Sequence, residues 1–222
     1  FFFHPHPATP DAQESRGLGD VYKRQGVYFS NKFEGARLNN VNQLNDSTYI
    51  LSILPENKPI NDSPYYAFKI WSSSSKKVLL KFQYPKNFKH RYIPKIKSNG
   101  IWKTADSLNF KFDDNLSSLT IKINDNPKII SGQELHTSSI VYKWVDQLIS
   151  GKESYIKFKE IGKTKLNRPF KVLDIYKGVP KNKPVIVILT RQHPPEVTGY
   201  FAFKVFLNTI LKENKLSSIF LD

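Results

Sequence analysis

The feature that most constrains the fold of this chain is the uninterrupted apolar run Val185–Leu189, between Pro184 and Thr190. Four of its five residues are β-branched, and turn-forming residues follow it. A short apolar run of this kind predicts a β-strand that is buried on both faces. Such strands occur in sheets that helices cover, so the run predicts an α/β layer around residues 184–190.

His193 and Glu196 follow this predicted strand directly. Ligand sites on α/β sheets form at the carboxyl ends of the strands, and side chains one helical turn apart can face one point. The pair therefore predicts half of a zinc site, with His193 and Glu196 as metal ligands. The spacing alone is more typical of a histidine at a strand end and a solvated glutamate in a first helical turn than of a metal site.

The segment Arg191–Gly199 (RQHPPEVTG) resembles the first zinc-ligand motif of the zinc metallocarboxypeptidases. It is most similar to the branch that contains the cytosolic carboxypeptidases and their bacterial relatives. Residues 161–173 resemble the hairpin of that family and residues 142–148 its first helix. Pro195 stands where the family usually has Gly, which stiffens the loop but keeps the ligand spacing.

The resemblance implies a Zn²⁺ cofactor held by His193 and Glu196, and hydrolysis of C-terminal peptide bonds by a zinc-activated water. It also implies that a second histidine ligand, substrate-binding arginines, a tyrosine and a general-base glutamate lie beyond Asp222. A catalytic zinc ion needs three protein ligands. We therefore assign no catalytic residue, and expect an incomplete fragment that is inactive alone. Arg191 could bind substrate, but an arginine at a strand end is more often structural, so it stays outside the metal set.

The chain predicts an α+β protein of two domains behind a leader. Residues 26–133 read as an antiparallel β-sandwich, since short alternating stretches recur between turn residues. The strands are expected at 47–53, 65–71, 77–84, 107–112 and 118–123. Residues 134–222 read as the truncated first part of an α/β zinc-carboxypeptidase domain. Its helices are expected at 140–149 and 196–212, and its strands at 155–161, 170–176 and 184–190.

Three looser matches, at residues 33–38, 63–70 and 100–103, resemble the small β-domain that precedes catalysis in cytosolic carboxypeptidases. A generic β-sandwich would share much of this pattern. Residues 15–25 (SRGLGDVYKRQ) resemble a sequencing adapter translated in frame. We therefore expect residues 1–25 to be a non-native, adapter-derived or disordered leader that takes no part in the fold.

The composition limits the partners. The formal net charge is +15, and there is no cysteine, so disulfides and thiolate metal ligands are excluded. No apolar run reaches the roughly 18 residues of a membrane span. The positive charge is more typical of a lysine- and asparagine-rich composition on solvated strand faces than of a site for polyanions such as acidic peptide tails. The resemblance implies a peptide or protein C-terminal tail as substrate, and the charge would suit acidic tails. Nucleic acid is disfavoured, because no basic cluster interleaves with aromatic residues on a recognisable module.

Two other functional classes stay open. One is a non-catalytic binding protein whose basic β-sandwich recognises acidic polymers. The other is a family member without activity that acts through protein interactions. The C-terminal sequence distinguishes the latter from an active peptidase, since the chemistry needs the later histidine and glutamate.

Overall fold

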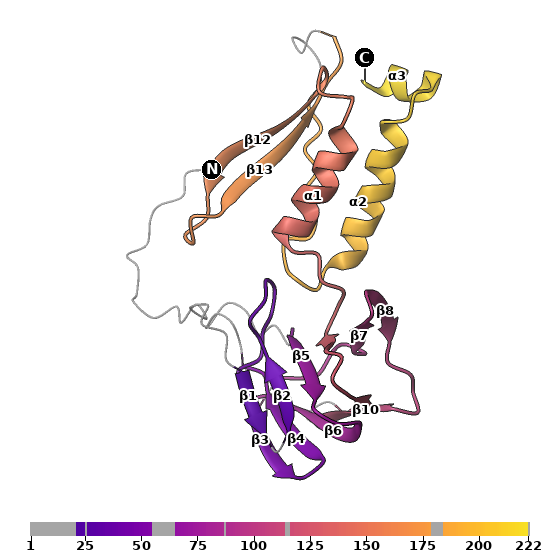
Figure 1. Ribbon diagram of the computed structural model, residues 1–222. Helices are drawn as coiled ribbons and strands as arrows, with labels where there is room; N and C mark the ends of the chain where they lie inside the picture. The colour runs from indigo at the N-terminus through magenta and orange to yellow at the C-terminus, as the bar shows by residue number, and fades with distance from the viewer. Residues whose placement is uncertain are drawn as a thin grey trace. The chain divides into compact units, whose positions relative to one another are not determined.

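The computed structural model describes residues 21–24, 26–54, 65–86, 88–113, 116–178 and 184–221. The chain divides into two compact units, residues 1–135 (unit 1) and residues 136–222 (unit 2), and each is described by itself. Most of the regular structure is β-sheet, with three helices among the described residues, which confirms the predicted α+β class (Figure 1).

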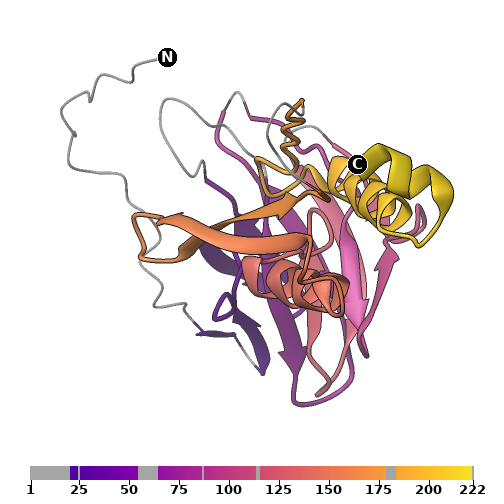
Figure 2. The same ribbon diagram turned by 90° about the horizontal axis from the view of Figure 1, so that it is seen from above.

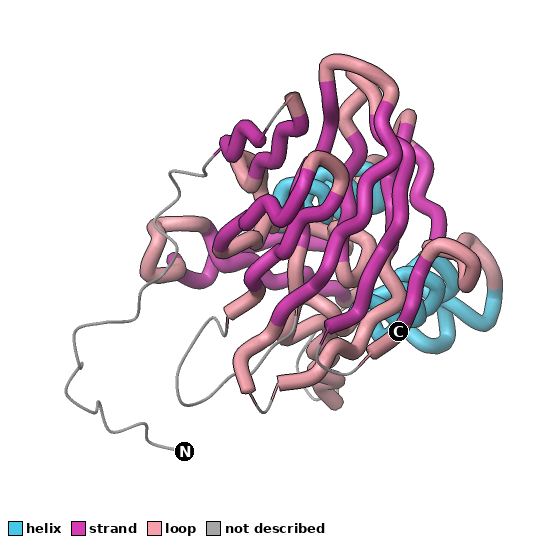
Figure 3. The backbone as a smooth tube through the Cα atoms, turned by 90° about the horizontal axis from the view of Figure 1, so that it is seen from below, coloured by secondary structure: helices cyan, strands magenta, loops and turns pink. Residues whose placement is uncertain are grey.

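Unit 1 consists of two β-sheets, seen as strands running side by side in Figure 3. The six-stranded sheet has the order β1 (Val21–Arg24), β2 (Val27–Ser30), β5 (Ala67–Ser72), β11 (Lys128–Ser131), β7 (Lys95–Ser98) and β8 (Ile101–Thr104). The five-stranded sheet has the order β3 (Asn40–Asn45), β4 (Thr48–Ser52), β6 (Lys76–Gln83), β10 (Leu116–Ile123) and β9 (Phe110–Lys111). Thus β11, the last strand of unit 1, lies in the middle of its sheet.

Alternating burial makes these sheets a sandwich. In β10 every second residue, from Ser117 to Ile123, points into the core, as the period of a strand with one buried face requires. Both sheets contribute to one apolar core, whose largest fully buried side chains include Phe29, Phe68, Tyr49, Phe82 and Leu80. The prediction of a purely antiparallel sandwich is wrong in one respect, because β4 pairs with β6 in parallel.

The predicted strands of the sandwich are found, although that at 107–112 shrinks to β9. The β7–β8 hairpin was not predicted. Asn99 and Gly100 connect its strands, with φ of 50° and 82°. Two consecutive left-handed residues are typical of the tight turn that suits the twist of a hairpin. The Asn-Gly dipeptide was therefore a sequence signal for this hairpin.

Most of the expected leader lies outside the described residues. Val21–Arg24 are the exception, since they form β1 and pair with β2. The structure thus places four residues of the 1–25 segment in a sheet, where the sequence pattern predicted none. The origin of the segment stays a prediction.

Unit 2 contains the predicted first helix and hairpin. Its elements are α1 (Ser138–Ile149), β12 (Ile156–Lys163), β13 (Pro169–Ile175), α2 (Val197–Ile210) and α3 (Lys215–Leu221). Helix α1 begins after Thr137, whose side chain makes no capping hydrogen bond, and ends before Gly151, which has the left-handed φ of 75° that favours glycine. Among the helices of the described residues, none has both the length and the hydropathy that a membrane crossing requires.

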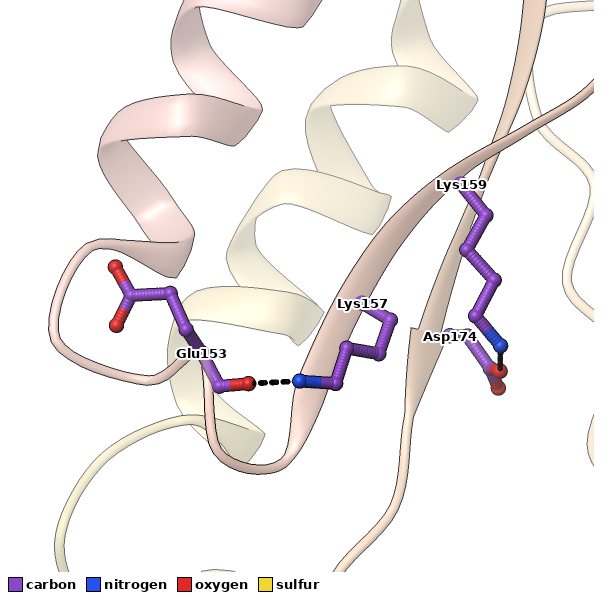
Figure 4. A network of polar contacts seen from close by, with 4 residues as sticks. All are labelled: Glu153, Lys157, Lys159 and Asp174. Carbon is purple, nitrogen blue, oxygen red and sulfur yellow. Dashed lines mark hydrogen bonds and ion pairs between the residues drawn. The ribbon is translucent and has the colours of Figure 1, made fainter.

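The β12–β13 hairpin is a long twisted ribbon (Figure 2). Asn167 lies in its turn with a φ of 59°, and asparagine tolerates this conformation better than most residues other than glycine. Figure 4 shows its polar contacts: Lys159 Nζ pairs with Asp174 Oδ2 across the strands at 2.8 Å, and Lys157 Nζ donates to the carbonyl of Glu153. The ion pair is exposed, so it contributes little to stability.

The prediction of a buried strand at 184–190 is wrong in this structure. The segment forms no strand, and 85% of Val185, 76% of Val187 and 75% of Leu189 is exposed. A strand buried on both faces needs paired neighbours and covering helices. Within the described part of unit 2, the only strands are β12 and β13, and they pair with each other. The segment therefore has the residues of a central strand without the sheet.

One polar side chain is buried in the sandwich core. His90 is 2% exposed and lies among aromatic rings. Its Nε2 contacts the carbonyl of Tyr92, which can only accept, so Nδ1 accepts from the hydroxyl of Tyr84 at 3.0 Å. Burial lowers the pKa of His90 to about 4. The neutral imidazole is thus the form that the core accommodates.

We expect the stability of unit 1 to fall as the pH drops from about 6.5 to about 4. The unfolded chain takes up a proton on His90 near the ordinary pKa of 6.5, whereas the folded form resists protonation until about 4. This shift corresponds to roughly 3 kcal/mol, present above pH 6.5 and lost by about pH 4. Hydrogen exchange of the β6 and β10 amides at several pH values, in the wild type and in His90→Gln, measures it. A difference between the two proteins that is independent of pH would contradict this assignment.

The exposed segment 185–189 should cause self-association. Val187→Lys places a charge in the apolar run, so we expect a lower apparent mass at equal concentration in sedimentation experiments. The matched control is Leu108→Lys, because Leu108 is 91% exposed and lies in unit 1. If both variants reduce association equally, net charge is the cause and the segment is not.

Candidate metal centre

The two predicted ligands lie together in the loop that leads into α2. Pro194 and Pro195 separate them, and α2 begins immediately after Glu196. The backbone N–H of Glu196 donates to the carbonyl of His193 at 3.2 Å, so the loop closes as a tight turn. The sequence spacing alone, with its two prolines, therefore brings both side chains to the same side of the loop.

The side chains contact each other directly. His193 Nδ1 lies 2.6 Å from Glu196 Oε1, and the backbone N–H of His193 donates to Glu196 Oε2 at 3.1 Å. The hydrogen bond from the imidazole, followed by that from the backbone, lowers the pKa of the Glu196 carboxyl. Both side chains are about half exposed, at 57% and 50%. The carboxylate is thus held in its ionised form, the form that a metal ion binds.

Arg191 fixes the start of this loop. Its backbone has a φ of 52°, in the left-handed region that few non-glycine residues adopt. Its guanidinium donates to the carbonyl of His136 and to that of Pro194, the latter at 3.3 Å. Arg191 therefore links the loop to the segment before α1, which is a structural role.

Two contacts around this loop were not foreseen. The ring of His136 lies 5.0 Å from the rings of both Tyr200 and Phe201 of α2, so it packs against the helix that follows the loop. Gly199 of α2 lies close to Thr190, since a Cβ atom at Gly199 would be 3.6 Å from the Thr190 hydroxyl. A small apolar hollow of about 260 Å³ separates residues 188–190 from the same helix face.

The two side chains are of types that bind zinc, but they are fewer than the three protein ligands of a catalytic zinc site. An imidazole nitrogen and a carboxylate oxygen are two of the ligand types that zinc takes. Within the described residues there is no cluster of three or more histidine, cysteine, aspartate or glutamate side chains. The pair could therefore supply two ligands, and a further ligand has to come from elsewhere.

Comparison with known proteins supports this interpretation. Residues 141–219 match the family model for zinc carboxypeptidases, and this range includes both His193 and Glu196. The match confirms the resemblance predicted from the sequence, but it does not distinguish the cytosolic branch. A comparison with curated proteins finds no match.

The fold is that of metallocarboxypeptidase structures. The crystal structure of a metallo-carboxypeptidase from Burkholderia cenocepacia is similar with a TM-score of 0.67 and 12% identity, covering 85% of this chain and 50% of that one. A protein of Shewanella denitrificans OS-217, assigned as a carboxypeptidase A, is similar with a TM-score of 0.64 and 17% identity, covering 83% of this chain and 49% of that one. The chain spans about half the length of these structures.

We expect this chain to bind zinc weakly through the pair. Structural sites with four ligands bind zinc with roughly 10–16 kcal/mol, so half the set suggests roughly 5–8 kcal/mol, a Kd of about 1 µM to about 0.2 mM. Isothermal titration with Zn²⁺ should lose this component in His193→Ala and in Glu196→Ala. Gln192→Ala is the matched control, because Gln192 is exposed in the same loop. Unchanged binding in His193→Ala would exclude the pair.

Proposed function

We propose that this chain is the N-terminal portion of a zinc-dependent metallocarboxypeptidase and is inactive by itself. The observation that carries the proposal is the His193–Glu196 pair, which lies inside the range that matches the family model. The coverage of about half of each similar structure is what a portion of a longer enzyme would give.

His193 and Glu196 would hold the metal, with another histidine from later in the longer chain. Bound zinc would lower the pKa of a coordinated water and polarise the carbonyl of the scissile peptide bond. The hydrogen bond from the Arg191 guanidinium to the carbonyl of His136 would keep the loop in place, because Arg191 lies two positions before His193. To bind the metal, His193 Nδ1 and Glu196 Oε1 must give up or rearrange their mutual hydrogen bond.

For the substrate we propose the C-terminal tail of a peptide or protein, with acidic tails favoured. The net charge of +15 supports this choice, since it attracts acidic segments over a Debye length of about 8 Å at physiological ionic strength. The same preference agrees with the resemblance of residues 191–199 to the cytosolic carboxypeptidase branch.

The test uses the longer protein that contains this sequence, expressed from the extended reading frame. Release of the C-terminal residue from peptides ending in Glu, Lys or Phe is measured by mass spectrometry, with and without a chelator. Loss of an outer-shell partner of a metal costs about 10–100-fold, so loss of a ligand in His193→Ala or Glu196→Ala should cost at least about 100-fold. Gln192→Ala should keep activity, and the chain of residues 1–222 should show none.

Two results would contradict the proposal. Activity that persists in a chelator and in His193→Ala would place the chemistry elsewhere. A longer protein without any peptidase activity, but with unchanged zinc binding, would instead favour a family member that acts through protein interactions.

A further inference from the structure

Unit 1 carries a groove of about 690 Å³ that no residue of the candidate metal centre lines. Strands β6, β7, β8 and β10 line it, together with the loop from Ala105 to Asn109. Its apolar part consists of Ile96, Ile101, Ala105, Leu119 and Ile121. Leu119 and Ile121 belong to the buried core, so the groove opens onto the interior of the sandwich.

Three lysines line the groove: Lys77, Lys103 and Lys122. All three are exposed, and Lys77 stands directly opposite Lys122 in the pairing of β6 with β10. Directly opposite residues have Cβ atoms about 5 Å apart, and like charges there destabilise a sheet. An anionic ligand would relieve this repulsion.

Among the described residues, Asp106 is the one carboxylate that lines the groove, and its hydrogen bonds are local. It accepts from the side-chain amide of Asn109 at 2.9 Å and from the backbone N–H groups of Leu108 and Asn109. These bonds, the Asn109 side chain first, lower the pKa of the Asp106 carboxyl. Asp106 therefore fixes the loop, and the lysines leave the groove with a net positive charge.

The groove is also bordered by free strand edges. β8 is the last strand of its sheet, at the margin of unit 1 in Figure 1. Asn99 and Gly100 close the hairpin as a two-residue turn, so Ser98 and Ile101 form a hydrogen-bonded pair. The hydrogen-bonded pairs alternate along the strands, so the next one joins Ile96 to Lys103. The backbone groups of Trp102 and Thr104 therefore point away from β7. Likewise β9 pairs with β10 only at Ser118 and Leu119, so among the described strands none follows β10 beyond that point.

We infer that this groove binds an extended acidic peptide segment, which adds to β8 as an extra strand. The outward backbone groups of Trp102 and Thr104 pair with the main chain of the peptide, and alternate side chains face the groove. Carboxylates at those positions meet Lys103, which stands opposite Ile96, and the long side chains of Lys77 and Lys122 border the groove from the outer face of the five-stranded sheet. A nucleic acid fits less well, because it cannot extend the sheet and the described lining of the groove includes no aromatic residue for base stacking. The site goes beyond the proposed peptidase function and needs neither His193 nor zinc.

The experiment measures the fluorescence anisotropy of a labelled peptide of about eight residues, with alternating Glu and Thr, against the whole chain in EDTA. Lys77→Glu combined with Lys122→Glu should weaken binding about tenfold or more, since two attractive charge pairs are lost and the reversed charges repel the peptide. Thr104→Pro keeps all lysines but removes one outward N–H donor, a change that an edge strand tolerates, and should also weaken binding. Circular dichroism establishes whether each variant is folded. If one of them does not fold, Lys103→Glu is tested in its place.

The matched control combines Lys143→Glu with Lys165→Glu, which changes the net charge equally at two exposed lysines of unit 2. The proposal is supported if the wild type and the control variant bind the peptide and the groove variants do not. Three outcomes overturn it: equal binding of a Gln-Thr peptide, equal weakening by the control pair, or competition by a thymidine octanucleotide at the same concentration as the peptide. The last result would indicate general attraction of polyanions to the charge of +15.

Discussion

Backbone hydrogen bonding between strands is the constraint on which the described structure depends. Among the described residues of unit 1, eleven strands satisfy it across two sheets, and a core of aromatic and aliphatic side chains forms between them. In the described part of unit 2, only β12 and β13 have paired strand backbones, and the apolar segment at residues 185–189 stays exposed. A buried strand is stable only when its N–H and C=O groups are paired, so apolar composition alone did not bury this segment.

The same constraint shapes the candidate metal centre. The loop with His193 and Glu196 follows a segment that has no sheet to position it, and it is ordered by two local features and one long-range hydrogen bond instead. These are the tight turn that brings Glu196 to His193, the start of α2, and the guanidinium of Arg191 on the carbonyl of His136. Local contacts suffice to pair two ligands, but a third ligand requires a neighbouring strand or loop at the same edge.

The sequence predicted those elements whose pattern repeats within a short window. Helix α1, the β12–β13 hairpin and five of the eleven described strands of the sandwich (β4, β5, β6, β9 and β10) have clear periodicity, and the His193–Glu196 pair follows from its spacing. The 184–190 strand failed because its formation depends on partners far away, which periodicity does not encode. The β7–β8 hairpin was not predicted for a different reason, because its signal, the Asn99–Gly100 dipeptide, is local and was overlooked. The packing of His136 against α2 joins positions more than 60 residues apart, and only the fold could show it.

The central position of β11 has a consequence for the order of folding. β11 comes last in the sequence of unit 1, yet it alone joins β5 to β7. Without it, the six-stranded sheet would consist of two separate pieces, β1-β2-β5 and β7-β8. Since a ribosome delivers the chain from its N-terminus, the sandwich cannot close until Ser131 has emerged, and such long-range pairings are slow to form. Until then the nascent chain exposes the unpaired edges of β5 and β7. During this interval the chain is most prone to aggregate and most in need of a chaperone.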